Sequence, residues 1–183
     1  TVNIVYQDNW TGQWNVFHKR VSNYGEGAYL TRQLTSGTEF NGYPCVATSM
    51  GTDDQYVYFA YQAFWPGNAE IMYKRLDDYG NTAATVYTAR LTYSDTASRM
   101  NSISFDGTND IVHISYDDAW PGNYDVMHRK FLDNGGAGFT AQRVSWGTGD
   151  SSHSAIAASD AGAFIVWADN TSGNYEIYFK KGS

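Results

Sequence analysis

Apolar residues alternate with other residues in four similar segments of the chain, and in each segment a short polar loop separates two alternating runs. The segment "SYDDAWPGNYDVMHRK", Ser115 to Lys130, shows the pattern most clearly. An alternation of period two on both sides of a loop rich in Asp, Pro, Gly and Asn predicts a β-hairpin. Matching segments begin at Val5, Ala60 and Val166. The sequence therefore predicts one hairpin in four copies.

The spacing of the copies predicts the fold. The loop glycines Gly12, Gly67, Gly122 and Gly173 lie 55, 55 and 51 residues apart. Each period contains four strand signals, which we name A to D, and the hairpin loop joins B to C. Repeats of about 50 residues built from strands are typical of propeller blades. We expect one all-β, β-propeller-like domain over residues 1–183, with four-stranded antiparallel blades in units 1–35, 36–92, 93–145 and 146–183.

Strand B is apolar on both faces, which is expected for a strand covered on both sides. Positions ten, eight and six before the loop glycine read Val112, Ile114 and Tyr116 in the third copy, and the alternate positions are also largely apolar. A blade packed between two others meets this condition. Strand C ends in a basic pair in every copy, and charge near a sheet edge discourages aggregation.

These segments resemble a known repeat. "SFDGTNDIVHISY", "YDVMHRKFLDNGG" and "QRVS" resemble the TolB-like β-propeller repeat of bacterial proteins, and "VWADNTSGNYEIYFKK" is similar to a variant in secreted members. The resemblance implies a propeller and a secreted or periplasmic location, but it specifies function poorly. Phe105 stands where the repeat has Pro, Trp occupies three of the hairpin loops, and the sialidase Asp-box pattern is absent.

The strand signals begin with B and end with C, so the first and last blades are expected to be incomplete. Three arrangements fit: a four-bladed propeller with two three-stranded blades, a segment of a larger ring, or copies of the chain that complete one another. The first residue is Thr and no signal peptide precedes the repeats. We therefore expect a processed or excised form.

Composition excludes several classes of function. The net charge is −7 and the basic residues are dispersed by the repeat, which argues against nucleic acid as a partner. No run of 18 apolar residues occurs, so no membrane span is expected. Cys45 is the only cysteine, which excludes an intrachain disulfide and a thiolate metal cluster. We expect no cofactor.

One aromatic column in the hairpin loops is the best candidate for binding. Trp can stack on the C–H face of a sugar ring, and neighbouring Asp or Asn can hydrogen-bond to the hydroxyl groups. The alternative is that each Trp folds over its own hairpin and seals the blade end. The candidate ligand-binding residues are Trp10, Trp65, Trp120, Tyr124, Asp118, Asn123, Asn68, Asp8 and Tyr175.

Nothing in the sequence assigns a catalytic residue. Nucleophile elbows and the common metal and phosphate motifs are absent, and an active site is expected to depart from repeat symmetry. The clearest such departure is Arg99, the one basic residue outside the repeat columns, and a single arginine does not make an active site. An acidic column, Glu70, Asp125 and Glu176, suits hairpin hydrogen bonding better than a Ca²⁺ site, so no metal site is assigned.

The sequence thus favours a non-catalytic, lectin-like module that binds a glycan or polysaccharide. The alternatives are a propeller scaffold that associates with further copies of itself, and a glycan-cleaving enzyme of the sialidase-like or polysaccharide lyase-like kind. An active site of that kind is assembled from distant strands, so the sequence leaves this alternative open.

Overall fold

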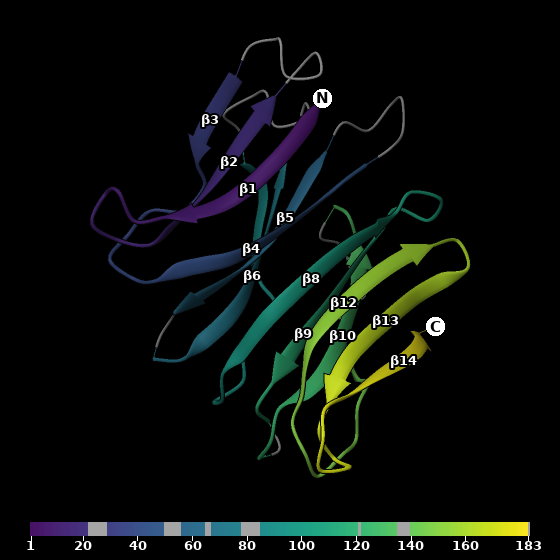
Figure 1. Ribbon diagram of the computed structural model, residues 1–183. Helices are drawn as coiled ribbons and strands as arrows, with labels where there is room; N and C mark the ends of the chain where they lie inside the picture. Colours follow the sequence, from purple (N-terminus) through teal and green to yellow (C-terminus); the bar gives the residue numbers. More distant parts are fainter. Residues whose placement is uncertain are drawn as a thin grey trace.

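The residues that the structure describes form four antiparallel sheets, which follow one another in space (Figure 1). The computed structural model describes residues 1–21, 29–49, 56–64, 67–77, 85–120, 122–134 and 140–182. In chain order the strands are β1 (Val2–Asp8), β2 (Asn15–Val21), β3 (Tyr29–Gln33), β4 (Asn41–Thr48), β5 (Val57–Phe64), β6 (Ala69–Leu76), β7 (Thr85–Arg90), β8 (Ser98–Asp106), β9 (Ile111–Asp118), β10 (Asp125–Leu132), β11 (Thr140–Arg143), β12 (Ser151–Ser159), β13 (Gly162–Asp169) and β14 (Glu176–Gly182).

Each sheet is a meander of consecutive strands. The orders are β1-β2-β3, β4-β5-β6-β7, β8-β9-β10-β11 and β12-β13-β14. This confirms the prediction of an all-β chain in antiparallel sheets, and the first and last sheets have three strands each. Within the described residues, no helix is long and apolar enough to cross a bilayer.

The sheets pack face against face, and this packing forms the core. Tyr58 and Tyr73, on one face of the second sheet, are buried against Ile114 and Tyr116 of the third. Val16 of the first sheet lies in a second cluster with side chains of the second sheet, and a third cluster joins the third and fourth sheets. The apolar pattern on both sides of strand B therefore reflects burial between two neighbouring sheets.

Two lysines of strand C connect neighbouring sheets. The Nζ of Lys74 donates a hydrogen bond to the carbonyl oxygen of Leu34 in the preceding sheet. Lys180 makes the equivalent bond to the carbonyl oxygen of Val144, at 3.2 Å. Burial lowers the pKa of Lys74. These members of the basic pairs thus join sheets, a role that edge protection alone does not predict.

The first strand of each later sheet contains a register shift, between Gly42 and Cys45 in β4, Arg99 and Ser102 in β8, and Ser152 and Ala155 in β12. Tyr43 and His153 have positive φ values of 50° and 57° at these shifts. A register shift leaves backbone N–H groups without partners in the ladder. The N–H of Tyr43 donates to the side chain of Gln7, and that of His153 donates to the side chain of Asp117, each in the preceding sheet.

Candidate functional site

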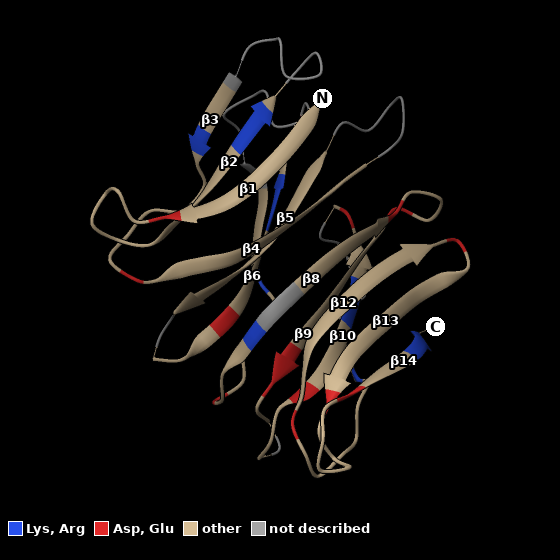
Figure 2. Cartoon of the chain, viewed as in Figure 1, with Lys and Arg blue, Asp and Glu red and all other residues tan. Residues whose placement is uncertain are grey.

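The hairpin loops between strands B and C are shaped by a repeated aspartate. The backbone N–H of Trp10 donates to Oδ1 of Asp8, and that of Trp120 donates to Oδ1 of Asp118, both at 2.8 Å. A side chain that accepts a bond two residues on forms an Asx turn. Figure 2 shows acidic residues at the ends of β1, β9 and β13, where these turns lie.

The aspartates are therefore occupied by the turns. Asp118 also accepts bonds from the hydroxyl groups of Ser98, at 2.9 Å, and Thr96, at 3.3 Å, and it is buried. Its first role is to hold the hairpin, as the general use of Asp in turns predicts.

The loop tryptophans point into solvent. Trp10 is 76% exposed and Trp120 is 62% exposed. A tryptophan that sealed its own hairpin would be buried, so these two residues do not act as seals. Trp65, the third member of the predicted column, lies outside the described residues. The rings of Trp10 and Trp120 are accessible to a ligand.

Two asparagines connect the hairpin loops to the next connection along the chain. The Nδ2 of Asn68 donates to the carbonyl oxygens of Ser94 and Thr96, at 2.7 and 2.9 Å. Asn123 makes the matching bonds to Gly147, at 3.3 Å, and Gly149, at 2.5 Å. These bonds use the amide N–H groups of the two side chains to fix the loops in place.

A second aromatic column, which is not among the residues predicted from the sequence, lies on these connections. Tyr93 and Trp146 are both well exposed. The guanidinium of Arg90 lies 4.6 Å from the ring centre of Tyr93, and that of Arg143 lies 4.7 Å from the ring centre of Trp146. In each pair the arginine covers one face of the ring, and the cation–π contact stabilises the ring in this position. The available signal was the spacing Arg, apolar, Thr or Ser, aromatic, which occurs in both copies.

The arginines are themselves held by the acidic column. Arg90 Nη2 lies 2.6 Å from Oε1 of the buried Glu70. Arg143 pairs with the buried Asp125, which also accepts a bond from the Ser145 hydroxyl at 2.9 Å. These two carboxylates therefore anchor the aromatic platforms. Among the described residues, no group of three or more His, Cys, Asp and Glu side chains is placed to hold a metal ion.

Open hollows lie against Tyr93 and Arg90. One has a volume of about 320 Å³ and is also lined by Asn68, Ser94 and Asp95. The other, of about 420 Å³, includes Arg129. Each offers an aromatic ring together with hydrogen-bonding side chains, which is the combination needed to bind the apolar face and the hydroxyl groups of a sugar.

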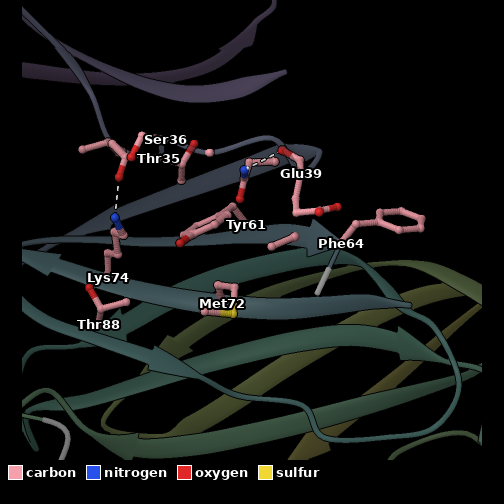
Figure 3. A pocket seen from close by; sticks show the side chains of 12 residues that line it. Thr35, Ser36, Glu39, Tyr61, Phe64, Met72, Lys74 and Thr88 are labelled. Carbon is pink, nitrogen blue, oxygen red and sulfur yellow. Dashed lines mark hydrogen bonds between the residues drawn. The ribbon is translucent and has the colours of Figure 1, made fainter. Parts of the chain in front are cut away.

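A third hollow, of about 310 Å³, lies on the side of the second sheet that faces the first (Figure 3). Tyr61, Met72 and Phe64 give it a more apolar lining, and Glu39 lies at its rim. Its lysine, Lys74, points toward the connection after the first sheet and is used in the bond to Leu34. Among its described lining residues, Glu39 is the only carboxylate, so they provide no carboxylate pair.

Arg99, the outlier of the sequence analysis, lies in a polar cluster between the third and fourth sheets. Its guanidinium is 3.5 Å from the ring centre of Tyr124. Beside it, Oδ2 of Asp117 accepts a bond from the backbone N–H of His153 at 3.2 Å. Burial raises the pKa of Asp117 to about 7, although Arg99 and two backbone bonds oppose the shift. Tyr124 is thus stacked on Arg99.

The predicted site residues lie in separate places. Asp118, Trp120 and Asn123 share one hairpin, Asp8 and Trp10 share another, and Tyr175 is exposed near the start of β14. Among the predicted residues that the structure describes, the hairpins present separate aromatic surfaces, which suit repeated weak contacts.

Comparisons with known proteins address the fold. No family model and no curated protein matches the chain. An endo-arabinase from Bacteroides thetaiotaomicron is similar in structure, with a TM-score of 0.60 at 9% sequence identity, over 99% of this chain and 70% of that chain. At this identity the likeness concerns the fold alone, which in that enzyme is of the propeller type.

Proposed function

We propose that the protein is a secreted or periplasmic, carbohydrate-binding, lectin-like module of propeller type. The observation that carries the proposal is the exposure of Trp10 and Trp120 on hairpin loops held by Asx turns. The Asx turns fix the backbone that carries these rings, and a Trp ring has only two side-chain torsions to order and supplies a large contact area on binding.

The second aromatic column strengthens the proposal. Tyr93 and Trp146 are each held by an arginine on one side and are open on the other. Together with the tryptophans they form repeated flat surfaces suited to a glycan with several similar sugar units. Weak sites of this kind gain affinity when one chain engages several at once. The structural neighbour is a glycan-acting enzyme, which agrees with a glycan or polysaccharide as partner.

A glycan array followed by calorimetry tests the proposal. We expect Trp120→Ala and Trp146→Ala to lower affinity about tenfold each, which corresponds to about 1.4 kcal/mol. The control is Leu132→Ala, which removes an exposed apolar side chain from the end of β10 that lies away from the hairpin loop. Binding of no glycan by the folded protein would refute the lectin function, and release of reducing ends would instead favour the glycan-cleaving alternative.

A further inference from the structure

The last sheet exposes an apolar face that the other sheets bury. We call the face that a sheet turns toward the next sheet its forward face, and the opposite one its backward face. In the last sheet, Val166 is paired with Phe179 across the β13–β14 ladder, and the Phe179 ring stacks on Phe164 with centroids 6.3 Å apart. Ile177 and Phe179 are 77% and 63% exposed. These side chains form the forward face of the last sheet.

The equivalent positions are buried wherever a further sheet follows. Counted from the loop glycines, Ile177 corresponds to Val16, Ile71 and Val126, all of which are 0% exposed. Phe179 corresponds to Tyr73 in the second sheet, which is also fully buried. The forward face of the last sheet therefore has the chemistry of an interface between sheets.

The first sheet shows the complementary exposure. Val2 and Ile4, on its backward face, are 52% and 44% exposed. Their counterparts in the second sheet, Val57 and Phe59, are 0% exposed because they pack against the first sheet. The backward face of the first sheet thus resembles three faces that are buried elsewhere in the same chain.

One chain leaves these two faces apart. The first and last sheets lie at opposite ends of the molecule (Figure 1). Among the described strands, those in substantial contact across sheets belong to consecutive sheets only. Within the chain a forward face meets a backward face three times, and each contact builds an apolar cluster.

We propose that the forward face of the last sheet binds the backward face of the first sheet of a second copy, so that copies associate head to tail. The contact would repeat the interface that the chain already forms three times, with Ile177 and Phe179 of one copy covering Val2 and Ile4 of the next. A second copy is the partner that the structure specifies, because it carries the face that these positions bind within the chain.

Head-to-tail contact has a definite consequence for the assembly. The two surfaces in contact are different, so an open assembly keeps one free backward face at one end and one free forward face at the other, and it can add copies until a ring closes. A symmetric dimer that uses the same patch twice would bury only one kind of face. The two arrangements are therefore distinguishable by blocking each face separately.

The test uses two double variants. Ile177→Asp with Phe179→Asp blocks the forward face, and Val2→Asp with Ile4→Asp blocks the backward face. We expect light scattering of the wild type at about 100 µM to show assembly, because this concentration is far above a Kd of about 1 µM. Each double variant alone is expected to have the mass of one chain. Mixed in equal amounts, the two variants are expected to form a pair that does not grow further, because one retains the backward face and the other the forward face.

The controls separate assembly from folding. All four side chains are exposed, so the variants are expected to keep the circular dichroism of the wild type, and Thr in place of Asp provides a milder pair if they do not. Tyr93→Asp with Trp146→Asp removes exposed rings outside both faces and is expected to leave assembly unchanged. A monomeric wild type, assembly of either blocked variant alone, or failure of the mixed variants to pair would each overturn the proposal.

Discussion

Replacing Asp117 by Asn is expected to change how stability depends on pH. Asp117 uses its Oδ2 to accept the N–H of His153 at the register shift of β12. At the equivalent shift of β4, the neutral amide of Gln7 accepts the N–H of Tyr43 at 2.6 Å. A carboxylate is therefore not required for this bond. Among the described residues, the Oδ1 atom of Asp117 has no hydrogen-bond partner.

The magnitude follows from the shift in pKa. Burial raises the pKa of Asp117 from 3.8 to about 7 in the folded protein, so the folded state holds this proton more tightly than the unfolded state. The stability that protonated Asp117 contributes is fully present below pH 4, is lost as the pH rises toward 7, and changes no further above that. At 1.36 kcal/mol for each pKa unit, the total loss is about 4 kcal/mol.

The side chain of the Asp117→Asn variant would be neutral at every pH, so this dependence should disappear. The new amide N–H₂ would take the place of Oδ1, which has no hydrogen-bond partner in the described part of the chain. Burying the N–H₂ without an acceptor would lower the free energy of unfolding by about 1–3 kcal/mol. We expect Asp117→Asn to destabilise the protein by about that amount at pH 4 and to stabilise it by about 1–3 kcal/mol at pH 8.

Urea denaturation at intervals from pH 4 to pH 8 measures the difference between the two proteins. The comparison cancels the contributions of other titrating groups. The control is Asp125→Asn, which removes a buried carboxylate that is paired with Arg143 and should lower stability by about 3–5 kcal/mol at pH 7. Parallel curves of stability against pH for the wild type and Asp117→Asn would show that the reasoning about burial is wrong.

Three further predictions concern other buried groups. Burial lowers the pKa of His128 to about 4. The stability that neutral His128 contributes above pH 6.5 should therefore be lost as the pH falls toward 4, by up to about 3 kcal/mol. Thermal melts should show a smaller loss of stability at low pH for His128→Tyr. Arg143→Gln should cost about 3–5 kcal/mol because it leaves Asp125 buried and unpaired; adding Asp125→Asn should recover most of that loss in a double-mutant cycle, and an additive result would contradict the pairing. Gly42→Ala would place a Cβ 2.5 Å from the Phe40 ring; it should lower the melting temperature, whereas the control Gly107→Ala, at ordinary contact distance, should change it much less.

The repeat made much of the fold predictable. Aligning Gly67 with Gly122 placed the hairpin strands where β5, β6, β9 and β10 are found, because period-two alternation and turn residues are local signals. The incomplete end sheets followed from the same alignment. The link from Lys74 to Leu34 was not predictable, because it depends on which sheet faces which.

The candidate site was harder to predict for a physical reason. The same loop sequence allows Trp120 to fold over its hairpin or to project into solvent, and the choice depends on side-chain torsions and neighbouring loops. The platform of Tyr93 depends on Arg90 reaching Glu70, which lies 20 residues earlier in the chain. Such a contact becomes visible only when the strand register is known.

The order of the sheets, each in contact with its neighbours along the chain, has a consequence for how the protein unfolds. A chain whose units contact only their neighbours behaves as a linear array, and its stability is approximately a sum of unit and nearest-neighbour terms. The second and third sheets each have two neighbours, whereas the outer sheets have one. In a single, unassembled chain, fraying therefore begins at the outer sheets, with β14 first since both of its faces are exposed, and amide protons of β5 and β9 should be the last to exchange.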